Sequence, residues 1–182
     1  MKKNRKIFWL FILVAMMQVA VPLSMIWHWE DVLQNGRQYT WVTVPIDPYD
    51  ALKGRYVDLQ FKETKGPVQG GITLKSGQAA YALIVEDEQG YAFISGVSNV
   101  RPEGNSYVKV EVSYVQDDQI VHFSLPFKRY YMQEYLAPKA EIAYRENASK
   151  ECVVLVRIKD GYGVVEQLYI GDKTMYEYLR EE

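Results

Sequence analysis

Residues 7–27 carry no charged side chain, and this run of 21 residues constrains the fold more than any other feature of the sequence. A helix of that length extends for about 31 Å at ~1.5 Å per residue, which matches the hydrocarbon thickness of a bilayer. Four basic residues precede the run, and Trp27 and Trp29 lie at its far end, where aromatic rings suit the membrane–water interface. We therefore expect a transmembrane helix over residues 7–27.

Two other interpretations of this run are weaker. A cleaved signal peptide has a small residue three positions before the cut, whereas cleavage after Ala20 would place Gln18 there. A buried core helix does not need so many consecutive uncharged residues. We expect an uncleaved signal anchor, with residues 1–6 as a basic cytoplasmic tip and residues 28–182 as one extracytoplasmic domain of a single-pass protein of the cell membrane.

The charge and the rare residue types exclude several classes of protein. The net charge is −2, and setting aside the four N-terminal basic residues leaves −6 for residues 28–182. No basic excess points to nucleic acid, and we expect anionic lipid head groups to repel the exported part as a whole. The single cysteine, Cys152, excludes an internal disulfide and a cysteine-rich zinc cluster. No phosphate-binding or dinucleotide-binding motif is present, so we expect no cofactor.

Beyond the helix, which we expect to end at Asn35-Gly36, the apolar pattern changes from a helical period to alternation. Residues 64–71 favour a loop, residues 127–137 a short helix or irregular crossover with exposed tyrosines, and residues 139–146 a helix. The expected strands cover residues 39–46, 55–63, 79–86, 91–97, 108–114, 121–125, 152–159 and 164–170. This pattern predicts a mainly β domain, an antiparallel sandwich or a barrel-like sheet with a short helical crossover.

Residues that could carry a reaction are sparse. The two histidines are His28, at the edge of the apolar run, and His122, which we expect to face solvent from a strand. A Ser-His-Asp triad is therefore not indicated. Asp47 and Asp50 could share a calcium ion, but carboxylates beside Pro48 more often cap the N–H groups of a turn. We expect neither a metal site nor a catalytic set.

Tyrosines favour a binding surface. Of the fifteen in the chain, Tyr130, Tyr131 and Tyr135 cluster near the basic pair Lys128 and Arg129. Tyrosine offers apolar contact area with a polar tip, and recognition surfaces are enriched in it. The alternative is that these rings cover a thin core.

Residues 45–61 resemble the GDYXXLXY membrane-protein family. Its lead-in, P-x-D-P-x-D-x-L-x-G, is matched at Pro45, Asp47, Pro48, Asp50, Leu52 and Gly54. In the Gly-Asp-Tyr…Leu…Tyr strand that follows, Tyr56 and Leu59 match, whereas Arg55 replaces the aspartate and Phe61 the last tyrosine. Residues 129–134 resemble a second block, R-Y-y-x-x-E, and the turn at residues 160–161 resembles a third.

The resemblance implies a short bacterial protein with a membrane anchor and an exported domain. Members of the family have no established activity and often accompany multi-spanning membrane proteins, which implies such a protein as a partner. We therefore predict a non-enzymatic interaction module that binds a membrane-protein partner or an envelope ligand. The predicted binding residues are Asp47, Asp50, Arg55, Tyr56, Arg129, Tyr130 and Glu134.

Two alternatives stay open at this point. Asp47, Asp50 or Glu134 could act as acid or base in a hydrolase of envelope material, if their surroundings separate their pKa values. A purely structural subunit of a membrane complex would need no ligand at all. The binding function gains weight over the structural one if the matched blocks meet at one concave surface.

Overall fold

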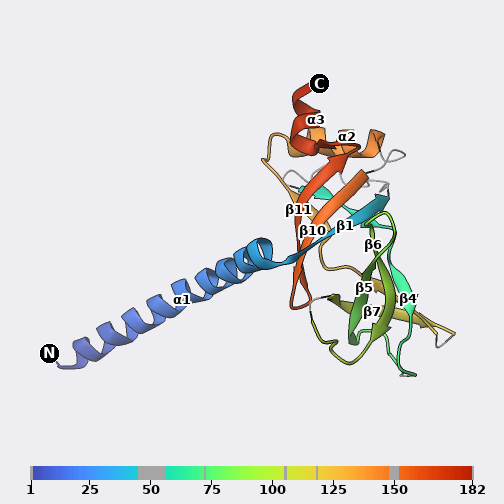
Figure 1. The fold of residues 1–182 in the computed structure, drawn as a ribbon. Helices are drawn as coiled ribbons and strands as arrows, with labels where there is room; N and C mark the ends of the chain where they lie inside the picture. Colours follow the sequence, from blue (N-terminus) through green and yellow to red (C-terminus); the bar gives the residue numbers. More distant parts are fainter. Residues whose placement is uncertain are drawn as a thin grey trace.

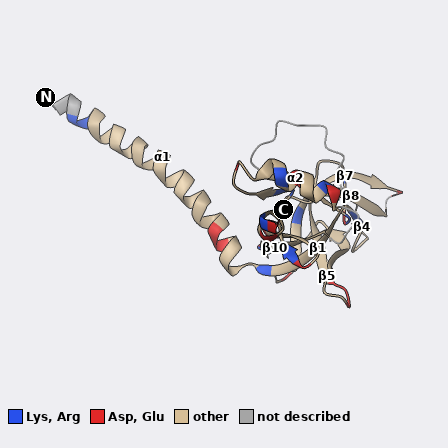
Figure 2. Cartoon of the chain, turned by 90° about the horizontal axis from the view of Figure 1, so that it is seen from above, with Lys and Arg blue, Asp and Glu red and all other residues tan. Residues whose placement is uncertain are grey.

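The computed structural model describes residues 2–44, 56–71, 73–104, 106–117, 119–147 and 152–181. A long helix, α1 (Lys2–Asn35), projects from a β-rich body (Figure 1). Figure 2 shows that α1 is free of charged residues between a basic turn near its start and acidic residues next to the body. By length and composition, α1 is able to cross a bilayer.

The last turn of α1 is packed against the body. Val32 is buried there, and Lys159 Nζ donates to a carboxylate oxygen of Asp31 at 2.7 Å. The Gly36 N–H donates to Val32 O at 2.9 Å, and a Cβ at Gly36 would lie 3.0 Å from the backbone nitrogen of Ile158. The helix thus ends immediately before a glycine, as the Asn-Gly pair predicts, and a Cβ there would collide first with Val32 O at 2.4 Å, within the same turn, and then with Ile158.

The first sheet receives the chain directly from α1. It has the strand order β12-β11-β10-β1-β3, and all neighbours in it pair antiparallel. A short C-terminal helix packs against β11 and β12. The elements are β1 (Arg37–Val44), β3 (Gln60–Phe61), β10 (Cys152–Lys159), β11 (Tyr162–Ile170), β12 (Lys173–Thr174) and α3 (Met175–Glu181).

The second sheet nearly closes on itself. Its order is β4-β8-β7-β5-β6, with β4 (Lys65–Pro67), β5 (Ala79–Glu86), β6 (Ala92–Ser98), β7 (Tyr107–Gln116) and β8 (Ile120–Ser124). The two edge strands meet, because Val68 and Val97 form a parallel bridge and the Gln69 N–H donates to Val97 O at 2.9 Å. A Cβ at Gly66 would lie 2.9 Å from Ile94 Cγ2. The two edge strands can therefore come this close because Gly66 has no side chain.

A separate two-stranded ribbon pairs β2 (Tyr56–Asp58) with β9 (Arg129–Tyr131). Helix α2 (Ala137–Glu146) contacts β2 and α3, and β9 contacts β11. The ribbon therefore lies between α2 and the first sheet, and its strand β9 contacts β11, one of the two strands against which α1 packs.

One apolar core joins the two sheets. Along β10, β1 and β5 buried and more exposed residues alternate, as expected of strands with one face inward. The rings of Trp41, Phe61 and Phe127 meet at its centre, with centroids 5.3–6.0 Å apart. These edge-on and tilted contacts are the arrangements that aromatic pairs favour, so the three rings fix the sheets to each other.

The expected fold class, a mainly β barrel-like domain after a long apolar helix, is confirmed. Strands β5 and β10 have the predicted bounds, and Val57, Leu59 and Phe61 are buried as their alternation predicts. The expected single strand over residues 55–63 is instead two short strands within its described part, because β2 and β3 pair with different partners.

Several local predictions are wrong. Residues 64–71 include β4 rather than only a loop, and the crossover at residues 127–137 includes β9. Both are three-residue strands that pair with segments more than fifty residues away, so their local sequence carries no alternating signal. The last hairpin turns more tightly than expected, since β11 begins at Tyr162. Helix α3 is not predicted at all.

Candidate functional site

The ribbon brings together residues 56–58 of the first matched block and residues 129–131 of the second. Tyr56 lies opposite Tyr131, and Asp58 lies opposite Arg129, in an antiparallel register. These residues are about seventy positions apart in the chain, and strand pairing makes them direct neighbours. The described end of the first block and the start of the second are thus parts of a single structural unit.

Arg129 lies at the centre of the polar face of the ribbon. Its guanidinium carbon is 4.5 Å from the ring centroid of Tyr56, which is cation–π geometry. The rings of Tyr56 and Tyr131 meet edge to face at 5.8 Å. A hydrogen bond to Tyr131 raises the pKa of Arg129 above its ordinary value, and the nearby Tyr56 and Asp58 act in the same direction. The guanidinium is therefore a permanent cation held between two tyrosine rings.

Tyr130 points the other way. It is 4% exposed and belongs to the core, so the expectation of an exposed tyrosine at this position is wrong. Burial raises the pKa of its hydroxyl to about 12, with a smaller opposing effect from a hydrogen bond to Gln167. The alternation of side chains along β9 explains this, because Arg129 and Tyr131 face outward on either side of it. Tyr130 therefore supports the ribbon from inside.

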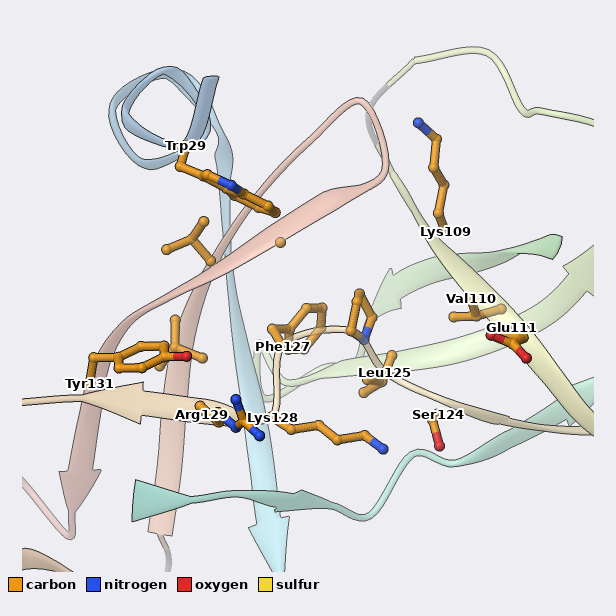
Figure 3. Close-up of a pocket in the computed structure, with 14 residues that line it drawn as sticks. Trp29, Lys109, Val110, Glu111, Ser124, Leu125, Phe127, Lys128, Arg129 and Tyr131 are labelled. Atoms are coloured by element: carbon orange, nitrogen blue, oxygen red, sulfur yellow. The ribbon is translucent and has the colours of Figure 1, made fainter. Parts of the chain in front are cut away.

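A groove of about 810 Å³ runs beside the ribbon. Its walls come from α1, β7, the segment 124–128, β9 and the start of β11. Figure 3 shows Trp29 of α1 on one side and Tyr131, Arg129 and Lys128 on the other, with Phe127 between them. A volume of this size is typical of sites that take one small ligand.

The charged residues of the groove are mainly basic. Lys109, Lys128 and Arg129 line it, against one carboxylate, Glu111. Lys109 Nζ lies 4.0 Å from the ring centroid of Tyr162. Among the described residues, no carboxylate is within ion-pair distance of Lys109 or Lys128. An anionic group in the groove would therefore meet two lysines that form no ion pair with any described carboxylate.

Two smaller cavities adjoin this groove. One of about 340 Å³ is lined by Asp58, Leu59 and Lys128, among others, on the far side of the segment 124–128. The other, of about 510 Å³, follows α1 from Pro22 to Leu33 and shares Trp29 and Val164 with the main groove. Apolar surface thus continues from the groove along the helix.

The structure describes only part of the predicted binding set. Tyr56 and Arg129 are brought into contact, and Glu134 is exposed in the turn that precedes α2. Asp47, Asp50 and Arg55 lie outside the described residues, so their part in binding stays a prediction. Within the described ranges, no group of three or more His, Cys, Asp or Glu residues is arranged to hold a metal ion.

Sequence reasoning missed Trp29, Lys128 and Val164 as parts of one site. Lys128 and Trp29 were visible as a basic neighbour of the tyrosines and an interfacial aromatic, but nothing local connects them. The link is the packing of α1 against β10 and β11, which depends on contacts between residues more than one hundred positions apart. The Asn35-Gly36 pair predicts that α1 continues past the apolar run, but the burial of Val32 against the body is visible only in the structure.

The comparisons with known proteins agree with the sequence resemblance. Residues 18–168, most of the chain, match the model of a protein family described as GDYXXLXY protein. No curated protein and no solved structure gives a significant match to the chain. The match begins inside α1 and ends in β11, so it includes the second half of α1, the second sheet, the ribbon and the first sheet except β12 and the last residues of β11.

Proposed function

Because the chain belongs to the GDYXXLXY family, we propose that it is a membrane-anchored, extracytoplasmic interaction module that binds a membrane-protein partner through the ribbon surface. That surface consists of Tyr56, Arg129, Tyr131 and Tyr135. The observation that carries the proposal is the pairing of the two matched sequence blocks in β2 and β9, next to a groove. If residues 56–58 served only to begin a strand, their pairing with residues 129–131 of the second block would not be expected.

The composition of the ribbon surface supports a protein partner. Tyr131 is 66% exposed and hydrogen-bonded to the permanently charged Arg129, and Tyr135, four residues further along the chain, is 73% exposed. Tyrosine and arginine are the residue types that most often dominate binding energy at protein interfaces. Exposing two such rings to water has no benefit for folding, and docking onto a partner would bury their apolar faces.

The anchor helix supports a partner in the same membrane. α1 is apolar through residues 7–27, and basic residues precede that run. The preference of basic flanks for the cytoplasm favours an orientation with the body outside. Because the last turn of α1 is packed on β10, the ribbon is held at a fixed place relative to the helix. Confinement of both proteins to one bilayer raises their effective concentration.

The two alternatives have less support. Of the three carboxylates named for a hydrolase, Asp47 and Asp50 lie outside the described residues, and Glu134 is exposed. Carboxylates that act as acid and base need surroundings that separate their pKa values, and exposure alone does not supply them. A purely structural subunit gives no reason for the basic groove beside the ribbon. The interaction module accounts for both the ribbon and the groove.

Affinity purification from detergent extracts tests the proposal. We expect the tagged full chain to retain a specific membrane protein, and we expect Arg129→Ala and Tyr131→Ser to reduce its recovery several-fold. Tyr114→Ser is the matched control, since Tyr114 is 53% exposed and lies outside the ribbon and the groove. Each variant must first keep the thermal midpoint of the wild type. Equal recovery by the ribbon variants and the control would refute the assignment of this surface.

A further inference from the structure

We propose that the groove between α1 and the ribbon holds one anionic phospholipid from the bilayer leaflet that α1 leaves at Trp27. The phosphate would lie against Lys128 and Arg129, and an acyl chain would follow the apolar face of α1. This goes beyond the binding of a protein partner and does not depend on it. Three observations carry the inference: an excess of basic residues in the groove, a mainly apolar path to the span, and the position of the groove relative to the span.

The charge of the groove suits a phosphate diester. Lys109, Lys128 and Arg129 line it against the single carboxylate of Glu111. Asp58 lies opposite Arg129 across the ribbon and contributes to the pKa rise of its guanidinium, so Arg129 is partly balanced. Lys128 has no ion-pair partner among the described residues, and it therefore offers the stronger attraction to an added anion.

An apolar path leads from these cations to the membrane-spanning part of α1. Phe127, Val165 and Trp29 line the groove, and Trp29 with Val164 also lines the adjoining cavity of about 510 Å³. That second cavity reaches Met25 and Ile26 and, one turn earlier, Pro22, inside the uncharged run. Its one charged lining residue is Glu30, next to Trp29 on the side of the body, so the apolar end of the path is the part toward Pro22. A ligand that filled both cavities would have a charged end at the body and an apolar end along the helix. A free phosphate has no apolar part that could fill the second cavity.

The groove lies at the depth of the lipid head groups. Trp29 is two residues beyond Trp27, so at ~1.5 Å per residue it lies roughly 3 Å past the end of the uncharged run. Each head-group layer is roughly 5–8 Å thick, half the difference between the whole bilayer and its hydrocarbon core. A lipid in the leaflet can therefore reach the groove without leaving the membrane.

The net charge of −6 on residues 28–182 does not favour general docking of the body onto an anionic surface. It is compatible with the capture of a single lipid, because a local pair of cations acts at short range. At physiological ionic strength, charges beyond about 8 Å are largely screened. The proposal therefore concerns one bound lipid per chain rather than a layer of lipid.

Native mass spectrometry of the full chain in detergent tests this inference. The protein is mixed with dioleoylphosphatidylglycerol or with dioleoylphosphatidylcholine, and the adducts are counted at increasing lipid concentration. We expect one phosphatidylglycerol per chain, retained at a concentration about ten-fold lower than phosphatidylcholine. Both lipids carry the phosphate, but the choline of phosphatidylcholine adds a positive charge that Lys109, Lys128 and Arg129 would repel. Lys128→Glu should weaken phosphatidylglycerol binding about ten-fold. Lys75→Glu, on an exposed lysine outside the groove, should leave it unchanged.

Further measurements distinguish binding of a membrane lipid from binding of a free phosphate, and loss of lipid binding from loss of folding. Glycerol phosphate in hundred-fold excess should not displace the lipid, and Trp29→Ala should weaken lipid retention. Equal retention of the two lipids would overturn the inference. So would wild-type lipid binding by Lys128→Glu at an unchanged thermal midpoint, or displacement by glycerol phosphate. Because the purified chain is tested without other proteins, this failure is distinguishable from loss of a protein partner.

Discussion

Gly163, the second residue of β11, lines the groove and lies directly against the ring of Phe127. A Cβ built on Gly163 would lie 2.3 Å from Cδ1 and 2.8 Å from Cε1 of Phe127. That ring is 4% exposed and is in contact with Trp41 and Phe61, with centroids 5.7 Å and 5.3 Å away. Gly163→Ala therefore places a methyl group where a buried aromatic ring already stands.

The cost of this substitution follows from its overlap with a packed ring. Inserting a carbon into a well-packed core costs about 1–3 kcal/mol. In a domain of this size each kcal/mol lowers the thermal midpoint by about 2–4 °C, which gives an expected loss of about 2–12 °C. The replacement of glycine also restricts the unfolded chain, which offsets the loss by less than about 1 kcal/mol.

Thermal unfolding of the full chain in detergent, followed by near-ultraviolet circular dichroism, measures this loss. Gly96→Ala is the matched control, because a Cβ at Gly96 meets only the exposed side chain of Gln69, which is free to turn aside. The double variant Gly163→Ala/Phe127→Leu should lose less than the sum of the single losses, since the shared overlap is relieved. A midpoint within 1 °C of the wild type for Gly163→Ala, or additive losses, would refute the packing described for the groove.

The ion pair and the tyrosine hydrogen bond at opposite ends of the first sheet give further predictions. A hydrogen bond from Lys159 lowers the pKa of Asp31 below its ordinary value of 3.8, so the pair stabilises the fold above pH 3.8 and loses this effect as pH falls through the lowered pKa. Lys159→Met should therefore lower the thermal midpoint at pH 7, and the difference should shrink as the scans are repeated toward pH 3. Tyr144→Phe removes the 3.0 Å hydrogen bond to Val44 O and should cost about 1 kcal/mol, whereas Tyr135→Phe, on an exposed ring, should cost nothing measurable by denaturant titration.

The elements that sequence reasoning located well are those whose own residues carry the signal. In β5 and β10, alternating apolar residues continue over eight positions, and a hairpin turn adjoins each strand. The pattern depends only on which face is buried, and period-two alternation records it directly. The end of α1 was located for a similar reason, since Gly36 is required by a contact within its own turn.

The elements that were missed depend on distant contacts. β4 contains Gly66 and Pro67, which locally indicate a turn, and it is a strand because it closes the second sheet between β8 and β6. β9 is three residues long and exists through its pairing with β2. The groove combines residues from α1, β7, β9 and β11, so no single segment could reveal it. The inward position of Tyr130 follows from the same pairing.

Photo-crosslinking in intact cells tests the central claim most directly, namely that the ribbon surface binds a protein partner outside the cytoplasm. Benzoylphenylalanine is placed singly at Tyr131, Tyr135 and Tyr114, all exposed positions. We predict a discrete protein adduct from Tyr131 and from Tyr135, absent from Tyr114 and lost when Arg129→Ala is added. Adducts of equal yield from all three positions, or none from the ribbon positions, would contradict the claim.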